Sequence, residues 1–181
     1  MQRLEIEMRA TFLSNLLNDT TAQEMLEEMS VQERHEYAVS DPAGRPIGVL
    51  IVEDGRVLRK AIEHGLGGRG FSVWGAGSGP EGVSIYRTYE DQIDVVLMDV
   101  NMPVLDGPQT LYLLRKINPG IRCCFMTGDI RESTLKMLHE HRPSQVFTKP
   151  LPHINLMAQE LWLCATQPAG VLQSSASPDH R

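Results

Sequence analysis

Five side chains that could bind a metal ion or a phosphoryl group stand at the ends of short apolar runs in this sequence. Glu53 and Asp54 follow one run, and Asp99 follows another. Thr127 and Lys149 stand at the ends of two later runs. A short apolar run bounded by Asp, Pro or Gly is typical of a buried β-strand that leads into a loop. We therefore expect each of these residues at the carboxyl end of a strand.

The chemistry expected of such a group is metal-assisted phosphoryl transfer. The carboxyl ends of parallel strands meet at one edge of a sheet, where three carboxylates repel one another unless a cation lies among them. A few hard oxygen ligands open to water suit Mg²⁺. Asp99 is ionised at neutral pH and would act as the nucleophile without a general base. Lys149 and Thr127 would hold the other phosphoryl oxygens through an ion pair and a hydroxyl hydrogen bond.

Strands and helices alternate along the part of the chain that would position these residues. Apolar runs predict the strands, and apolar residues at helical spacing predict a helix after each of them. This alternation is typical of βαβ units, because a parallel connection must be long and right-handed. We therefore expect an α/β fold, a three-layer doubly wound five-stranded parallel sheet. The expected strands are 47–52, 71–76, 93–98, 121–126 and 145–148, and the expected helices include 80–89 and 154–164.

The first forty residues differ in charge and pattern from the rest. They contain eight acidic residues and three arginines, and so account for most of the net charge of −6. Apolar residues at helical spacing in 1–17, and a capping-box pattern at 21–24, predict an N-terminal helical extension. We expect a helical hairpin that packs on itself or forms a homodimer. The predicted division is a helical extension at 1–40, a linker rich in Pro and Gly at 41–46, a domain at 47–166, and a disordered polar tail at 167–181.

The composition limits the class of protein. A chain of 181 residues with 41% hydrophobic residues can bury a core. The acidic balance argues against direct binding of nucleic acid. Adjacent Cys123 and Cys124 would point to opposite faces of a strand, which suits free thiols in a reduced compartment. Because no apolar run reaches the roughly 20 residues of a membrane span, and no signal-peptide pattern occurs, we expect a cytoplasmic location away from membranes.

Four motifs in order resemble the receiver domain of two-component response regulators, which has a flavodoxin-like fold. The resemblance covers roughly 47–166 and concerns both the strand ends and the loops that follow them. The motifs are Val49-Leu50-Ile51-Val52-Glu53-Asp54, Val96-Leu97-Met98-Asp99 with Met102-Pro103 and Asp106-Gly107, Met126-Thr127-Gly128, and Thr148-Lys149-Pro150.

The resemblance implies a phosphoprotein of a two-component phosphorelay rather than an enzyme with an external substrate. Asp99 would accept a phosphoryl group from a sensor histidine kinase or a phosphotransfer protein, and the domain would assist only its own phosphorylation and dephosphorylation. We expect a single-domain regulator without an output domain, which signals through an unknown downstream protein. The implied roles are direct Mg²⁺ ligation by Asp54 and Asp99, ligation by the Asn101 carbonyl, ligation by Glu53 through water, and phosphoryl contacts from Lys149 and Thr127.

One position departs from the family pattern. Receivers place an aromatic residue three positions before the lysine, as part of a switch that carries the signal to the surface. The residue at that position here is Val146, and Phe147 is next to it. A shift by one residue turns a side chain to the other face of a strand, so Phe147 is not expected to replace the aromatic residue. The departure concerns signal output and leaves the phosphorylation chemistry unchanged.

A dinucleotide-binding protein is the alternative prediction. Gly77, Gly79 and Gly82 fit the pattern G-x-G-x-x-G after a strand, and Asp99 lies about 20 residues further on, where such proteins place an acid. However, Pro80 lacks the N–H that this loop would offer to a phosphate. The alternative also leaves the residues at the other strand ends without a role.

Two further alternatives share parts of the pattern. A hydrolase with an aspartyl nucleophile would need a second carboxylate two positions after Asp99, and Asn101 stands there. A purely structural interaction module would bind its partner equally well after Asp99→Asn substitution.

Overall fold

The computed structural model describes residues 40–41 and 44–166. The helices expected before residue 40 and the tail expected after residue 166 lie outside the described residues. The described part contains a parallel sheet of five strands in the order β2-β1-β3-β4-β5. The α/β fold predicted from the alternation of strands and helices is therefore confirmed. The strands are β1 (Gly48–Val52), β2 (Ser72–Ala76), β3 (Val95–Asp99), β4 (Arg122–Thr127) and β5 (Gln145–Thr148).

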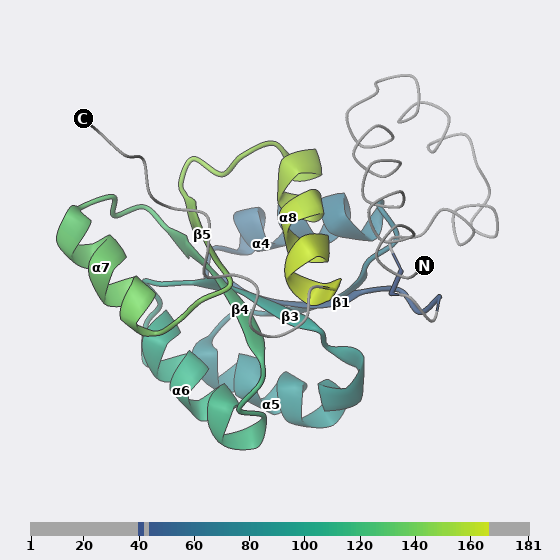
Figure 1. The fold of residues 1–181 in the computed structure, drawn as a ribbon, viewed down its shortest axis with the longest axis horizontal. Coiled ribbons are helices and arrows are strands. Elements are labelled where there is room, and N and C mark those ends of the chain that lie inside the picture. The colour runs from purple at the N-terminus through teal and green to yellow at the C-terminus, as the bar shows by residue number, and fades with distance from the viewer. Residues whose placement is uncertain (1–39, 42–43, 167–181) are drawn as a thin grey trace, which may run out of the picture.

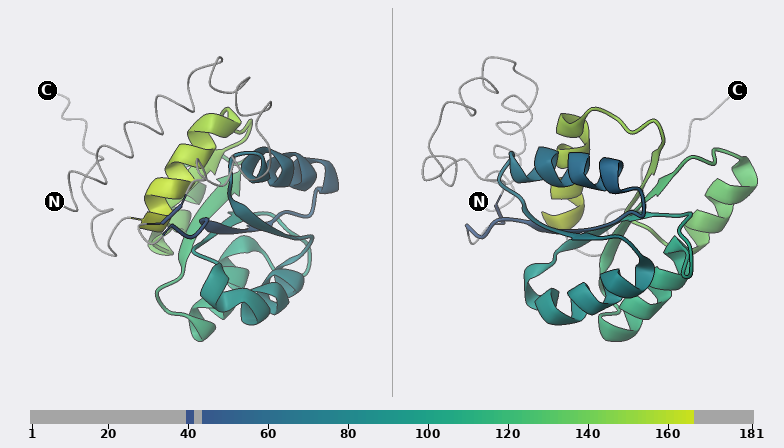
Figure 2. Two further views of the ribbon diagram at one scale, coloured as in Figure 1. Left: turned by 90° about the vertical axis from the view of Figure 1, so that its right-hand side faces the viewer. Right: turned by 180° about the vertical axis from the view of Figure 1, so that it is seen from behind.

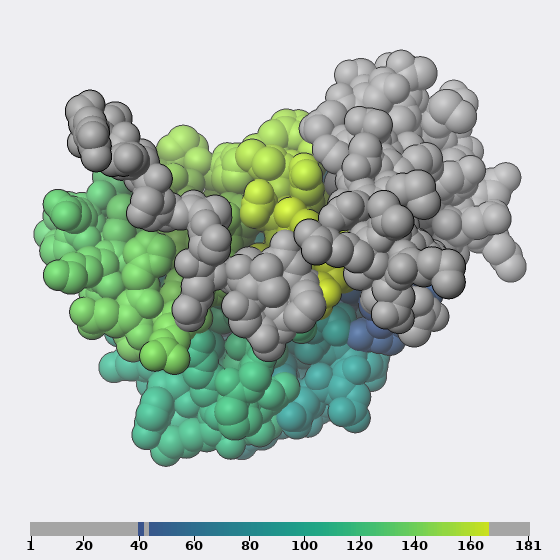
Figure 3. Space-filling model, viewed as in Figure 1, coloured from purple at the N-terminus to yellow at the C-terminus, as the bar shows by residue number. Residues whose placement is uncertain are grey.

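Helices cover both faces of this sheet and make the three layers visible in Figures 1 and 2. One face carries α4 (Arg56–Gly67) and α8 (Ile154–Thr166). The other carries α5 (Gly79–Tyr89) and α6 (Gly107–Ile117), and α7 (Glu132–Glu140) lies beyond them toward β5. In the space-filling view, the surfaces of α6 and α7 adjoin on one side of the molecule (Figure 3).

Two apolar cores, one on each face, hold the layers together. All residues of β1 and β3 are buried, and alternate side chains enter opposite cores. In β4, Cys123 packs in the core beneath α5 and α6, and Cys124 packs in the core beneath α4 and α8. The prediction that the adjacent thiols face opposite ways is confirmed, and both are free. Full burial of an aliphatic side chain contributes about 1.5–3 kcal/mol, so this inner sheet is a rigid platform.

The observed elements differ from the predicted ranges by one or two residues at several ends. The sequence pattern ended the third and fourth strands before Asp99 and Thr127, because a polar residue interrupts the apolar run. In the structure Asp99 still pairs with Met126, and Thr127 with Thr148. A short 3₁₀ turn at Glu90–Gln92 was not predicted. None of the helices in the described part of the chain is long and apolar enough to cross a membrane.

The described part of the linker contacts the sheet where β1 begins, at the end of the strand away from the acidic residues. Arg45 makes a two-pronged ion pair with Asp94, at 2.6 and 3.1 Å. The same Asp94 carboxylate accepts the backbone N–H of Gly48 at 2.7 Å, where β1 begins. Trp162 of α8 donates its indole N–H to the carbonyl of Ser40 at 3.3 Å. These contacts attach the start of the described chain to both β1 and α8.

Candidate functional site

Asp99 is the last residue of β3, in the centre of the sheet's carboxyl edge. Its side chain is 7% exposed, so its carboxylate is largely removed from water. The strand holds it firmly, because β3 pairs with β1 on one side and β4 on the other. After Asp99 the backbone stays paired for one more residue, since Val100 donates its N–H to the Met126 carbonyl at 2.9 Å. The nucleophile predicted from the sequence thus lies on a rigid support.

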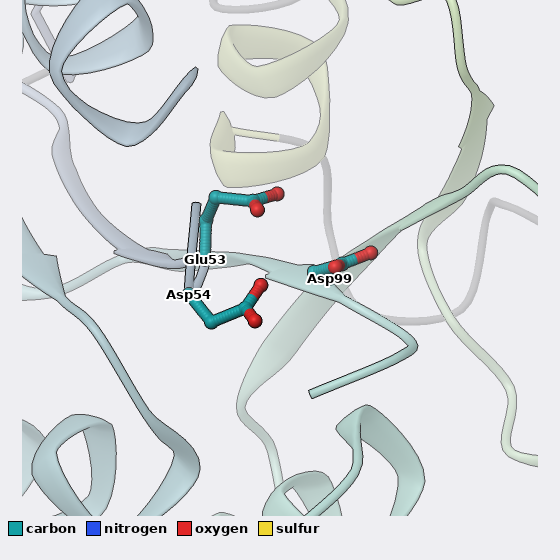
Figure 4. Close-up of side chains that lie close together, drawn as sticks. All are labelled: Glu53, Asp54 and Asp99. Atoms are coloured by element: carbon teal, nitrogen blue, oxygen red, sulfur yellow. The ribbon is translucent and has the colours of Figure 1, made fainter. Parts of the chain in front are cut away.

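Glu53 and Asp54 follow β1 and bring two more carboxylates to Asp99. Figure 4 shows that the side chains of Glu53 and Asp54 leave the loop after β1 and extend toward Asp99 at the end of β3. Carboxylate oxygens of the three residues lie within 4.8 Å of one another. Glu53 is buried, whereas Asp54 is exposed. The cluster is therefore closed toward the protein and open toward water on the side of Asp54.

Lys149 supplies the positive charge at this edge. Its ammonium lies 2.9 Å from Glu53 Oε2 and 3.1 Å from Asp99 Oδ1. Burial lowers the pKa of Lys149, but hydrogen bonds to Glu53 and Asp99 outweigh this effect and leave the pKa raised. The lysine is thus a cation that joins the two buried carboxylates.

One ammonium does not balance the negative charge of the cluster. Burial, followed by repulsion from Glu53, raises the pKa of Asp99, although the hydrogen bond from Lys149 opposes the shift. A cation beside a buried carboxylate favours its charged form and offsets repulsion from a neighbouring carboxylate. Three carboxylates within reach of one ion provide the hard oxygen donors that Mg²⁺ prefers. The residues present therefore fit a divalent cation.

Thr127 and Asn101 lie in or beside the loops that follow β4 and β3, next to this cluster. The buried Thr127 hydroxyl accepts the backbone N–H of Asp129 at 3.0 Å, so it is engaged with the loop after β4. Asn101 is exposed in the loop after β3, and a hydrogen bond from its backbone lowers the pKa of Asp99. Asp129 itself is held by Arg131, whose hydrogen bonds lower the pKa of the Asp129 carboxyl well below its usual range.

The loop between β3 and α6 is fixed by the Asp106-Gly107 pair. The Asp106 side chain caps α6 by accepting a hydrogen bond from the backbone N–H of Gln109 at 2.8 Å. In turn, the side-chain oxygen of Gln109 accepts a hydrogen bond from the backbone N–H of Asp106 at 3.1 Å. Gly107 packs against the strand end, since a Cβ there would lie 2.7 Å from the Asp99 carbonyl oxygen. Its N–H also binds the Val100 carbonyl at 2.9 Å. This motif therefore anchors the helix start directly behind Asp99.

Residues 49–159 match the model of the response regulator receiver domain. This chain belongs to the receiver family. Receivers are signalling phosphoacceptors rather than catalytic enzymes, and the carboxylates of Glu53, Asp54 and Asp99 are consistent with the family's Mg²⁺ site. The resemblance inferred from the four motifs is confirmed.

Similarity to known proteins agrees with this assignment. The sensor kinase CckA of Brucella abortus is 33% identical over 117 residues, which make up 65% of this chain and 12% of that protein. The chain therefore spans far less than two thirds of this relative. A receiver domain protein from Clostridium thermocellum has 26% identity and a TM-score of 0.58, covering 66% of this chain and 90% of that one. The CheX-CheY-BeF3-Mg+2 complex from Borrelia burgdorferi gives 25% identity and a TM-score of 0.59, covering 65% and 88%.

The glycines of the dinucleotide-binding alternative have structural roles in this receiver. A Cβ on Gly79 would lie 2.3 Å from the Thr110 hydroxyl, and one on Gly82 would lie 2.9 Å from Val52. The N–H of Gly77, which would face a phosphate in that alternative, binds Glu81 Oε2 at 2.7 Å. Close helix packing and an internal carboxylate thus account for the glycine pattern.

The aromatic position of the receiver switch contains a smaller side chain, as the sequence indicated. Val146 packs against the core beneath α5 and α6. Phe147 is 6% exposed and belongs to the opposite core, beneath α4 and α8. The two residues therefore face opposite sides of the sheet, and Phe147 does not occupy the place of the missing aromatic residue.

Two residues beside the acidic cluster were missed in the sequence. Arg59 of α4 donates to the backbone carbonyl of Glu53 at 2.5 Å and so holds the loop after β1. Gly55 donates its N–H to Glu53 Oε1 at 3.0 Å. The only sequence signal was their position, a glycine next to the acidic pair and an arginine one helical turn later.

Proposed function

We propose that this chain takes a phosphoryl group from a phosphohistidine onto Asp99 and passes the signal to a partner protein. The donor would be a sensor histidine kinase or a phosphotransfer protein of a two-component phosphorelay. The observation that supports this proposal best is the buried Asp99 carboxylate, which lies 3.1 Å from the Lys149 ammonium and beside two other acids.

The reaction would exchange one phosphorus bond for another. An Asp99 oxygen would attack phosphorus, the bond from phosphorus to the imidazole nitrogen would break, and the imidazole would leave with the electron pair and take up a proton. Bound Mg²⁺ would screen the carboxylate charge from the incoming phosphoryl oxygens. The residues proposed to hold it are Glu53, Asp54 and Asp99, with the Asn101 carbonyl.

Lys149 and Thr127 would change partners during this reaction. Lys149 now binds two carboxylates, and it would turn to a phosphoryl oxygen once Asp99 is modified. The Thr127 hydroxyl now accepts the Asp129 N–H, and a phosphoryl oxygen would compete for it. Movement of Thr127 would shift the loop after β4 and so favour one of two states of the surface formed by α7 and β5.

The proposed organisation extends beyond the site. The receiver would span 47–166, preceded by a helical extension at 1–40 and the linker 41–46, and would function in the cytoplasm. Val146 lies at the switch position, so the response of the α7–β5 surface would be weaker than with an aromatic residue there. The surface would act on a protein partner rather than on nucleic acid.

Phosphorylation by small donors tests the proposal. The protein is incubated with Mg²⁺ and either acetyl phosphate or phosphoramidate, whose P–N bond imitates phosphohistidine, and its intact mass is measured. We expect one added phosphoryl group in the natural chain, and none after Asp99→Asn or when EDTA removes Mg²⁺. Asp106→Asn is the matched control, because it removes a nearby acid but keeps a residue that can cap α6.

Two results would contradict the proposal. One is the absence of an adduct in the natural protein with either donor. The other is an adduct that persists after Asp99→Asn, which would place the phosphoryl group on a different residue.

A further inference from the structure

Gly55 is the first residue after the acidic pair and caps the start of α4. Its backbone angles are φ −66° and ψ 97°, a conformation that any L-residue can adopt. The glycine is thus not required by the backbone conformation. Gly55 is also exposed to solvent, so burial does not require a small residue there. A reason for its presence must be sought in what lies beside its Cα atom.

The carboxylate of Glu53 lies there and uses both of its oxygens. Oε1 accepts the Gly55 N–H at 3.0 Å, and Oε2 accepts the Lys149 ammonium at 2.9 Å. The side chain therefore folds back over residue 55 and also contacts Lys149, the first residue after β5.

A Cβ at position 55 would interfere with this arrangement. It would lie 2.9 Å from Glu53 Oε1 and 3.8 Å from Glu53 Cδ, and apart from the two chain neighbours no other residue lies within 4 Å. Contacts below 3.0 Å are not tolerated, so one group must move. The carboxylate is the end of a flexible side chain, and it would turn away more easily than the backbone would shift.

We infer that Gly55 is a positioning residue for the acidic site: its missing Cβ leaves room for the Glu53 carboxylate to fold onto the Gly55 N–H. This pose directs the second oxygen of Glu53 to Lys149 and keeps the carboxylate within reach of Asp54 and Asp99. The inference rests on the proposed metal site, because its consequence is a higher affinity for Mg²⁺. The effect of Gly55 on the site thus passes through the carboxylate of Glu53.

A double-mutant cycle on Mg²⁺ binding tests this pairing. The Kd for Mg²⁺ is measured by isothermal titration for the full chain, Gly55→Ala, Glu53→Ala and the double variant. We expect Gly55→Ala to weaken Mg²⁺ binding about tenfold, the scale seen when a group that orients metal ligands is lost. The same substitution should have no effect on the Kd in the Glu53→Ala background. Gly67→Ala is the matched control, because a Cβ there meets nothing within 4 Å.

A second measurement does not depend on the metal. Amide hydrogen exchange of residue 55, followed by NMR without Mg²⁺, reports the hydrogen bond to Glu53. Both Gly55→Ala and Glu53→Ala should lower its protection factor about fivefold, corresponding to one ordinary hydrogen bond. A role of Gly55 in helix capping alone would leave the protection unchanged in the Glu53→Ala variant.

The outcomes separate this inference from the proposed function. If the natural chain does not bind Mg²⁺, the metal part of the proposed function fails, and amide exchange alone decides the position of Glu53. If Mg²⁺ binds but Gly55→Ala leaves the Kd unchanged, the inference is wrong. An equal loss in both backgrounds also contradicts it, because the effect would then not pass through Glu53.

Discussion

Replacement of Lys149 by methionine removes the ammonium between two buried carboxylates. The Glu53 and Asp99 side chains are 4% and 7% exposed, whereas Lys149 is 27% exposed. Loss of one partner from a fully buried ion pair costs roughly 3–5 kcal/mol. Partial exposure of Lys149 lets water replace some of this interaction, so we expect a loss of roughly 2–3 kcal/mol in the free energy of unfolding at neutral pH. Methionine keeps most of the apolar stem, which limits the loss from packing.

The loss should depend on pH in a defined direction. Burial, and then the charge of Glu53, raises the pKa of Asp99 in the folded protein. A carboxyl group with a raised folded pKa binds its proton more tightly in the folded state, so its contribution to stability is complete below the unfolded pKa and is lost as pH rises through the folded pKa. Without Lys149 this pKa rises further. The deficit of Lys149→Met should therefore shrink as the pH falls from neutral to about 4, because Asp99 becomes protonated over this range.

Urea unfolding followed by tryptophan fluorescence measures this deficit at both pH values. Lys60→Met is the matched control, since Lys60 is 64% exposed and pairs with Glu63 on the surface of α4. The control should change the free energy of unfolding by at most about 0.5 kcal/mol. Mg²⁺ should restore part of the stability of Lys149→Met, because a cation that binds only the folded state stabilises it. An equal deficit at neutral and acidic pH would refute the electrostatic reasoning.

Three other substitutions and one double-mutant cycle test further contacts of the fold through unfolding free energies. Val104 has φ 73° and is 86% exposed, so Val104→Gly should relieve backbone strain and stabilise the protein by roughly 0.5–1 kcal/mol. Val57→Gly, at an equally exposed valine in α4, should instead destabilise it by about 0.4 kcal/mol, and the same sign for both would contradict this. Asp106→Ala should cost about 1 kcal/mol through loss of the capping box, whereas a neutral result would deny its role. A double-mutant cycle on Arg45 and Asp94 should give a coupling of roughly 0.5–1 kcal/mol, and a zero coupling would mean that the linker is not held there.

Much of the fold and the position of the central carboxylates could be predicted from residue order. The buried strands are continuous apolar runs, and parallel connections have only one common hand, so the order of elements limits the topology. Asp99 and Thr127 ended their runs in the sequence, and the structure places both at the carboxyl edge. The ends of the strands were less predictable, because backbone pairing continues through a polar residue when its neighbour supplies a partner.

The contacts of the site could not be predicted, because they depend on how loops from distant parts of the chain approach one another. Lys149 joins Glu53 and Asp99 rather than the exposed Asp54, and only the arrangement of β1, β3 and β5 decides this. In the same way, the Thr127 hydroxyl is engaged by its own loop instead of by the acidic cluster.

The sequence by itself determined that acids, a hydroxyl and a lysine would meet at one edge of a parallel sheet. It did so because strand ends and side-chain alternation follow directly from the pattern of apolar residues. Only the tertiary structure decided how Glu53 divides its two oxygens between Gly55 and Lys149. Such a choice depends on distances of a few tenths of an ångström around a missing Cβ, and residue spacing along the chain does not encode them.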